Sequence, residues 1–445
     1  MIYIHIPYCR SFCTYCDFYS VIPQCGYGRF ADAVCAEIGA REEEIRASVS
    51  HARTDNVSSC GPNTLYMGGG TPSVLPAETV GRIVAACRKA LSGMEEECSC
   101  GGGPFEEFTV EVNPDDIVQK GHGYVEALLG LGVTRVSMGV QSLDDRVLKW
   151  MNRRHDASSA RKAYRILKES GVENTGIDLI FGYDAGSIVL PDGIAWNGQD
   201  AEKYWSGMIE AALDISGDGS LPKHVSAYQL SIEDGSVLAG MVRDGSYSEP
   251  PEEECARQYD LLCGILASAG YHHYEISNFA MPGYEARHNS AYWRHVPYVG
   301  IGPAAHTLSF CGGCEVVSAA AAGLSPDAGK GGLWRRSWNA ADVDAYIAAA
   351  SSGDWNGIRE SESLTREQYR EEEIMLGLRT DRGVPVSLLA GNPDSAENTE
   401  KLLRAGALVP VGGVFSDKGG SGQEPRLRIP EDRFFVSDDI IAGLL

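Results

Sequence analysis

Short β-rich runs alternate with longer helix-compatible stretches in the first half of this chain, and this alternation limits its fold more than any other feature. The runs are Ile2–Ile6, Thr64–Met67, Phe108–Val112, Arg135–Gly139, Gly176–Phe181 and Val225–Leu230. Strands that alternate with helices form βαβ units around a parallel sheet. The pattern predicts an α/β fold, either an incomplete (β/α)6 TIM-like barrel or a flat doubly wound sheet. Polar or glycine clusters after the strands favour the barrel, because α/β barrels bind ligands at those ends.

The sequence changes in character near residue 360. Leu364–Arg382 is predicted to be a helix, with Thr365 as its cap, and three short strands are predicted at Ala407–Val411, Leu427–Ile429 and Phe434–Val436. This combination predicts a small α+β module, of which a winged helix is one form. We therefore expect a core barrel at 1–235, an extension and linker at 236–359, and a C-terminal module at 360–445. Four stretches are expected to be inserted loops: Glu97–Pro104, Asp184–Asp200, Cys311–Gly332 and Gly419–Glu424.

Three cysteines, Cys9, Cys13 and Cys16, directly follow the first strand. Their C-x3-C-x2-C spacing lets one loop present three thiolates to a single iron–sulfur cube and leaves its fourth iron without a cysteine ligand. Structural zinc takes four closed ligands, and no fourth thiol lies nearby in the sequence. The spacing favours a [4Fe–4S] cluster, with zinc or free thiols as the alternatives.

Polar residues also mark the ends of later strands. A run from Gly68 to Gly70, followed by Thr71, ends the second strand and removes every Cβ where a backbone approaches a ligand. Arg153 follows the fourth strand, and a guanidinium pairs well with a carboxylate. Buried polar groups need partners, so these residues predict either a self-satisfied network or contacts to a zwitterionic ligand that carries a ribose. The polar residues at or within the third, fourth and fifth strands are Glu111, Gln141 and Asp178.

Taken in order over residues 1–310, these motifs resemble radical S-adenosylmethionine (SAM) proteins of the oxygen-independent coproporphyrinogen III oxidase-like family. The resemblance is carried by Tyr3-Ile-His-Ile-Pro, the cysteine run to Phe18, Gly68-Gly-Gly-Thr-Pro-Ser, Glu111-Val-Asn-Pro, Gly139-Val-Gln-Ser, Ile177-Asp-Leu-Ile-Phe-Gly, Ser277-Asn-Phe and Gly283-Tyr-Glu-Ala-Arg-His-Asn, and Leu376-Gly-Leu-Arg-Thr fits the family's C-terminal module.

The resemblance implies a concrete site. Cys9, Cys13 and Cys16 are expected to hold a [4Fe–4S] cluster, whose open iron binds the amino and carboxylate groups of SAM. The SAM contacts implied by the motifs are Tyr3, Tyr15, Gly69, Gly70, Thr71, Glu111, Gln141, Arg153 and Asp178.

Two functions compete within this family. One is coproporphyrinogen III dehydrogenation, or another radical SAM reaction on a tetrapyrrole; the other is a heme chaperone, which binds heme and transfers it to acceptor proteins. The dehydrogenases carry a further cysteine two positions after the third and a longer segment before the cluster loop. Here Phe18 takes that position and the first strand begins at Ile2. Both departures favour the chaperone, so dehydrogenase activity is not expected.

The run Arg287-His-Asn-Ser-Ala-Tyr-Trp matches the H-N-x-x-Y pattern of the chaperones. A neutral imidazole is a natural axial ligand of heme iron. His288 is therefore the predicted heme ligand, supported by Asn289 and Tyr292, and the alternative is a hydrogen-bonded histidine without a ligand role. The rival histidines are His272, His273 and His306.

Charge and cysteine usage limit the partners and the compartment. The formal net charge of −23 argues against binding nucleic acid through a broad basic face. The sequence shows no export signal and no apolar run near the ~20 residues that span a bilayer, so an integral membrane protein is not expected. Thirteen scattered cysteines indicate reduced thiols in the cytoplasm. Heme and heme-accepting proteins are the expected partners, and a homodimer is left open.

Two features depart from the family or stand outside its motifs. The fifth strand runs into Tyr183-Asp-Ala-Gly186 and a long loop, where the family has a Gly-Leu-Pro-Gly turn. The resemblance therefore does not predict the shape of the barrel rim after this strand. The close cysteine pairs Cys98/Cys100 and Cys311/Cys314 lie in predicted insertions. We interpret them as free thiols, with a zinc site as the alternative.

Overall fold

One large sheet organises the computed structural model, which describes residues 1–24, 26–51, 63–93, 105–188, 201–311, 333–390, 393–412 and 424–445. Its strand order is β7-β8-β6-β5-β4-β3-β2-β1-β9. The first six strands are parallel neighbours in chain order, β9 adds parallel beside β1, and β8 and β7 add antiparallel beside β6. The strands are β1 Ile2–Ile6, β2 Thr64–Gly69, β3 Glu107–Val112, β4 Arg135–Gln141, β5 Thr175–Phe181, β6 His224–Gln229, β7 His272–Glu275, β8 Asn278–Ala280 and β9 Val299–Ile301.

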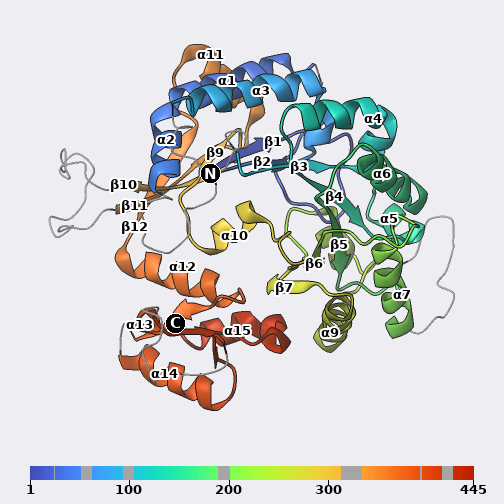
Figure 1. The fold of residues 1–445 in the computed structure, drawn as a ribbon, viewed down its shortest axis with the longest axis vertical. Helices are drawn as coiled ribbons and strands as arrows, with labels where there is room; N and C mark the ends of the chain where they lie inside the picture. Colours follow the sequence, from blue (N-terminus) through green and yellow to red (C-terminus); the bar gives the residue numbers. More distant parts are fainter. Residues whose placement is uncertain are drawn as a thin grey trace.

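Helices follow the strands and cover one face of the sheet (Figure 1). In the described residues β7 and β9 do not pair with each other, so the sheet ends at these strands. The predicted α/β fold is confirmed, with six sequential parallel strands in the order that an incomplete (β/α)6 barrel requires. The helices in this part are α1 Gly28–Ala40, α2 Glu42–His51, α3 Ala77–Ala90, α4 Pro114–Gly130, α5 Asp145–Trp150, α6 Ala157–Glu169, α7 Ala201–Leu213, α8 Val237–Arg243, α9 Glu252–Ser268 and α10 Arg287–Trp293, with a 3-10 turn η1 at Pro72–Val74.

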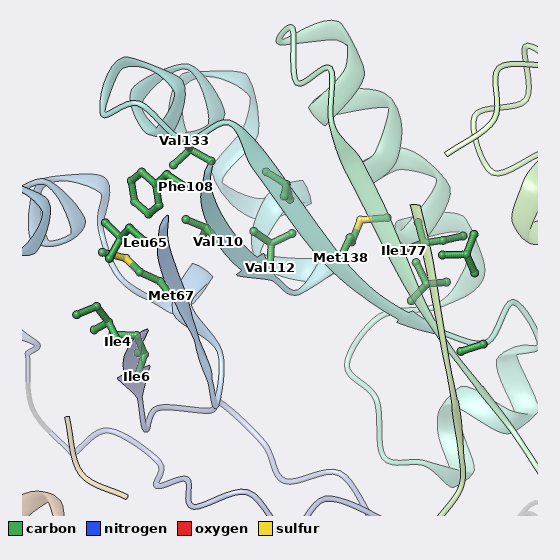
Figure 2. Packing of buried hydrophobic residues seen from close by; sticks show 14 of the residues in the cluster. Ile4, Ile6, Leu65, Met67, Phe108, Val110, Val112, Val133, Met138 and Ile177 are labelled. Carbon is green, nitrogen blue, oxygen red and sulfur yellow. The ribbon is translucent and has the colours of Figure 1, made fainter. Parts of the chain in front are cut away.

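The two faces of the strands differ in chemistry because side chains alternate along a strand. One set is apolar and buried between sheet and helices (Figure 2), where each large side chain contributes roughly 1.5–3 kcal/mol. Its labelled members are Ile4, Ile6, Leu65, Met67, Phe108, Val110, Val112, Met138 and Ile177, and the labelled Val133, just before β4, belongs to the same core cluster. The alternate set is polar or aromatic and includes Tyr3, Tyr66, Glu111 and Asp178. The concave interior of the barrel is therefore a polar site.

Two smaller antiparallel sheets complete the chain. β10 His306–Cys311, β11 Leu333–Asn339 and β12 Arg359–Leu364 form the first, and α11 Val343–Ser352 packs against α1. The C-terminal sheet has the order β13-β15-β14. Its elements are α12 Arg366–Leu378, β13 Val384–Pro385, α13 Val386–Leu389, α14 Pro393–Arg404, β14 Val409–Pro410, β15 Arg426–Arg428, η3 Glu431–Val436 and α15 Ser437–Ala442.

This C-terminal sheet agrees with the predicted α+β character of the module. Thr365 caps α12 through a capping box with Gln368, as the sequence indicated. The strand predicted at Phe434–Val436 is wrong, since these residues end the 3-10 helix η3 that begins after Pro430. A three-residue apolar run fits either structure, and the preceding proline favours a helical start.

Three further predictions concern the domain boundaries, the inserted loops and membrane spans. The division at residues 235 and 359 stays a prediction, and its second boundary falls inside β12. Almost all of the four predicted insertions lies outside the described residues, and so do Cys98, Cys100 and Cys314. None of the helices in the described ranges combines the length and apolar character of a bilayer span.

Candidate cluster and ligand site

The cysteine loop between β1 and α1 is fixed to several elements through its backbone. The Cys9 amide donates to the Val21 carbonyl at 3.0 Å, which closes the loop on itself. The Thr14 amide donates to the Met151 carbonyl at 3.1 Å, and the Thr14 carbonyl accepts from the Leu238 amide at 2.8 Å. The loop is therefore held against the ends of α5 and α8 at the carboxyl end of the sheet.

The three thiols share one electrostatic environment. The Cys9 Sγ lies 3.4 Å from the Thr71 Oγ1, and the Cys13 Sγ accepts a hydrogen bond from Arg153 Nη1 at 3.4 Å. Burial raises the pKa of the Cys16 thiol to about 11, and the neighbouring Cys13 and Cys9 add to that increase. Thiolates that repel each other in this way need a cation to become stable.

These residues fit an iron–sulfur cluster in donor type. Across the described ranges, no three His, Cys, Asp or Glu side chains already lie in a metal-binding arrangement. A cube takes each cysteine sulfur on a different iron, so the three thiols need not meet at one point. Arg153 Nε is buried and has no hydrogen-bond partner among the described residues, and an open donor beside Cys13 suits an anionic ligand.

The glycine run at the end of β2 lies too close to neighbouring protein atoms for larger residues to fit. A Cβ at Gly70 would lie 2.9 Å from the carbonyl oxygens of Ile6 and Tyr8. Gly69 has a φ of +105°, and a Cβ there would lie 2.6 Å from the His5 ring. The run thus lets the end of β2 lie directly against β1 and the cysteine loop. In this way it places Thr71 beside Cys9.

Arg153 and Tyr15 connect the cysteine loop to the fourth strand. Arg153 Nη2 donates to the Gly139 carbonyl at 2.7 Å, while its Nη1 donates to Cys13. The Tyr15 hydroxyl is buried, which raises its pKa, and the nearby Arg153 opposes that shift. Gln141 has a φ of +65° at a β-bulge in β4, a conformation that redirects a side chain at a strand end.

Carboxylates of the barrel interior form a connected polar layer. The Tyr66 hydroxyl donates to Glu111 Oε1 at 2.7 Å, and the Gly69 amide donates to Oε2 at 3.2 Å. Ser137 donates to Asp178 Oδ1 at 3.0 Å. Burial raises the pKa of Glu111 to about 7, and the charge of Asp178 adds to this. Glu111 is thus a carboxyl group that a cationic ligand would ionise.

Tyr3 and His5 extend this layer along β1. The Tyr3 hydroxyl lies 3.1 Å from His5 Nδ1, and His5 Nε2 donates to the Tyr19 carbonyl at 3.0 Å. Because a carbonyl only accepts, Nε2 carries the proton and Nδ1 accepts from Tyr3. Burial lowers the pKa of His5, so the ring stays neutral. The pair orients Tyr3 beside the aromatic ring of Tyr66.

His288 lies in the same barrel but at the opposite end of the strands. Its side chain is buried, at 1% exposure, and burial lowers its pKa to about 3. Nδ1 lies 2.6 Å from Thr64 Oγ1 and Nε2 lies 3.0 Å from the Tyr292 hydroxyl. Its ring packs on Tyr66 with centroids 5.1 Å apart. The imidazole is neutral, but both nitrogens have partners.

Thr64 begins β2, whereas the glycine run ends it. At about 3.3 Å per residue, the rise along the strand from Thr64 to Gly70 separates the two ends by roughly 20 Å. Glu107, at the start of β3, accepts the backbone amides of Arg287 and His288, each at 2.9 Å. The helix α10, near the centre of the view in Figure 1, is therefore anchored at the amino end of β3.

The rival histidines have structural partners. His272 lies between Glu285 Oε1 at 3.2 Å and Asp381 Oδ2 at 3.0 Å, and these carboxylates raise its pKa to about 9. His273 is buried and stacked on Phe279. His306 lies on β10, outside the barrel sheet.

A cavity of about 430 Å³ lies elsewhere, between α2 and the β10–β12 sheet. Its lining includes Arg335, Arg359, Phe310 and Trp355, and none of the predicted cluster, SAM or heme residues. The candidate site therefore rests on the contacts of the barrel interior and not on this cavity.

The sequence did not single out four polar residues of the interior: His5, Tyr66, Ser137 and Ser226. Tyr66 pairs in register with Tyr3, Ser137 with Glu111 and Ser226 with Asp178, and His5 follows Tyr3 by two positions. The two-residue period along each strand is the signal that identifies them.

Comparisons with known proteins show the family of the chain. Residues 3–188 match the model of the Radical SAM superfamily. The heme chaperone HemW of Lactococcus lactis is 34% identical over 384 residues, which cover 86% of this chain and 82% of that protein. The heme chaperone HemW of Bacillus subtilis is 28% identical and covers 86% and 84%.

A solved structure shares the fold. It is described as the coproporphyrinogen III oxidase HemN from Escherichia coli, a radical SAM enzyme. It aligns with a TM-score of 0.66 at 16% identity, over 100% of this chain and 89% of that one. At this identity the likeness supports the fold alone.

Proposed function

The chain belongs to the heme chaperone HemW family of the radical SAM superfamily, and on that premise we propose that it binds heme and passes it to heme-accepting proteins. The observation that carries the proposal is the 34% identity to a heme chaperone over 86% of the chain. Phe18 supports it, because this side chain is 66% exposed at the position where the dehydrogenases of the wider family carry a cysteine.

In this proposal Cys9, Cys13 and Cys16 hold a [4Fe–4S] cluster. When bound, the cluster together with SAM supplies one-electron chemistry at the SAM sulfonium. The chain's own residues would bind and orient: Arg153 donates to Cys13, and the buried Glu111 carboxyl would hold the amino group of SAM. The other SAM contacts in the proposal are Tyr3, Tyr15, Gly69, Gly70, Thr71, Gln141 and Asp178.

We propose His288 as the heme ligand, acting through Nε2. Its low pKa keeps the ring neutral, as iron requires. The Tyr292 hydroxyl holds Nε2 at 3.0 Å, so ligation requires Tyr292 to turn away. Thr64 can keep its contact with Nδ1 and hold the ring in orientation.

Anoxic reconstitution with iron and sulfide, followed by separate titrations with heme and SAM, tests the function. We expect one heme per chain, a shifted Soret band, and no protoporphyrinogen after incubation with coproporphyrinogen III and SAM. The expected transfer readout is movement of the heme to an apo-cytochrome acceptor. Multiple turnovers of coproporphyrinogen III would overturn the chaperone assignment in favour of the dehydrogenase.

A histidine pair tests the ligand. We expect His288→Ala to change the Soret band and weaken heme binding, and His272→Ala, which removes a rival held by two carboxylates, to leave both unchanged. An unaltered spectrum in His288→Ala would remove this residue from the ligand set. The proposal places the protein in the cytoplasm. A homodimer stays a prediction that sedimentation of the heme-loaded protein tests.

A further inference from the structure

A buried carboxylate outside the predicted site connects the cysteine loop to the rest of the barrel. Asp116, in the first turn of α4, is 0% exposed and lies at the carboxyl end of β3. A buried carboxylate is costly unless it is fully paired. Its partners therefore indicate what this position does.

Both oxygens of Asp116 are engaged by segments that surround the cysteines. Arg10, which lies between Cys9 and Cys13, brings its Nε to 3.6 Å from Asp116 Oδ1. Arg154 brings its Nη1 to 3.5 Å from the same oxygen. Ser73, at the end of the glycine motif, donates to Oδ2 at 2.8 Å.

These contacts connect Asp116 to the cysteines through two segments, the cysteine loop itself and the Arg153–Arg154 pair. Arg10 also donates to Gln119 of α4 at 2.5 Å, so two contacts tie the cysteine loop to that helix. Arg154 directly follows Arg153, which donates to Cys13. A shift of either arginine would move one of the groups that face the cluster.

Ser73 adds a third link. Its hydroxyl accepts the Asn113 amide at 2.9 Å while it donates to Asp116. The glycine motif of β2 and the Asn-Pro motif after β3 thus meet at one carboxylate. Thr71, two residues before Ser73, contacts Cys9.

We propose that Asp116 is the positioning residue of the cluster site: its carboxylate holds Arg10, Arg154 and Ser73 so that the three thiols converge when the cluster is bound. The inference rests on the cluster site proposed above and concerns no ligand directly. Outer partners of metal ligands typically change metal affinity by about 10–100-fold.

Iron release from the reconstituted protein to a chelator under argon tests this role. We expect Asp116→Asn to release iron about 10-fold faster or more and to alter the electron paramagnetic resonance signal of the reduced cluster. Asp115→Asn is the matched comparison. Asp115 lies on the same turn and contacts Arg154 but not Arg10 or Ser73, so its release rate should lie between those of the wild type and Asp116→Asn.

Arg10→Gln repeats the test with little risk to folding, because the Arg10 side chain is one-third exposed. It should also speed release, and the effect of the double variant Asp116→Asn/Arg10→Gln should fall short of the product of the two single effects, since the two residues share one contact. Release at the wild-type rate in both single variants would overturn the proposal.

A second measurement separates this proposal from the cluster assignment. In the apo protein, alkylation of Cys9, Cys13 and Cys16 by iodoacetamide, followed by mass spectrometry, reports how well the loop is held. Faster alkylation in Asp116→Asn than in Asp115→Asn supports positioning even if the wild type takes up no cluster. Equal alkylation rates in the two variants, with a matching unfolding midpoint, would count against it.

Discussion

At the scale of single residues, burial raises the pKa of carboxyl groups in the barrel interior. Glu111 accepts from Tyr66 and Gly69, yet its burial beside Asp178 raises its pKa to about 7. A carboxyl group with a raised pKa favours the protonated form in the folded protein. Its own contribution to stability therefore decreases as pH rises from about 4.5 to about 7.

The same shift predicts how SAM binding depends on pH. A cationic amino group binds the ionised form of Glu111, so lowering the pH from 7.5 to 6 should weaken SAM binding on the order of 10-fold. Equilibrium dialysis under argon measures it. Glu111→Gln should bind weakly at both pH values, without this slope.

Glu275 is the matched control for that experiment. Burial raises its pKa to about 7 as well, but it bonds to Asn278 and Asn289 rather than to the cluster side of the barrel. Glu275→Gln should keep the pH slope of SAM binding. If Glu111→Gln kept the slope and Glu275→Gln lost it, Glu111 would not be the group that binds the SAM amine.

At the scale of elements, α10 depends on one side chain for its position. This seven-residue helix has no capping side chain of its own, and the Glu107 carboxylate of β3 accepts its first two amides. An anionic acceptor also suits the positive end of a helix. The helix that carries His288 is thus fixed by a strand far away in sequence.

Glu107→Gln should lower stability by about 1–2 kcal/mol, because an amide offers one acceptor oxygen where the carboxylate offers two. Heme affinity should also decrease, by roughly tenfold for each 1.4 kcal/mol by which the substitution weakens the free energy of heme binding. Urea unfolding and heme titration measure the two effects. Glu106→Gln is the control, since Glu106 contacts only the Arg287 side chain of α10, and equal losses in both variants would contradict this role.

At the scale of the whole molecule, a single buried carboxylate joins the first helix to elements far along the chain. Glu37 of α1 is 0% exposed. It accepts hydrogen bonds at 2.7–3.2 Å from groups of α1, the β9 end, β11, α11 and β12. Those donors belong to Arg41, Gly302, Asn339, Tyr346 and Arg359.

Glu37→Gln should destabilise the protein by about 3–5 kcal/mol, because it leaves two arginines without their buried counter-charge. The change should appear as a lower midpoint of urea unfolding. Glu43→Gln, on the exposed side of α2, should leave the midpoint unchanged. A Glu37→Gln midpoint equal to that of Glu43→Gln would show that the cluster does not hold these elements together.

The sequence predicted what depends on local pattern and missed what depends on distant contacts. The six parallel strands were predicted from apolar runs and their spacing. The cysteine loop was predicted from three cysteines that lie close together in the sequence. The contact of His288 with Thr64 spans 224 positions and that of Asp116 with Ser73 spans 43. No local pattern encodes such pairs, and the short run Phe434–Val436 was too brief to distinguish strand from helix.

The two candidate sites lie toward opposite ends of the same strands, yet one side chain touches both. The Tyr66 ring packs on the imidazole of His288, and the Tyr66 hydroxyl donates to Glu111. The two ends are therefore coupled through a single tyrosine rather than insulated from each other.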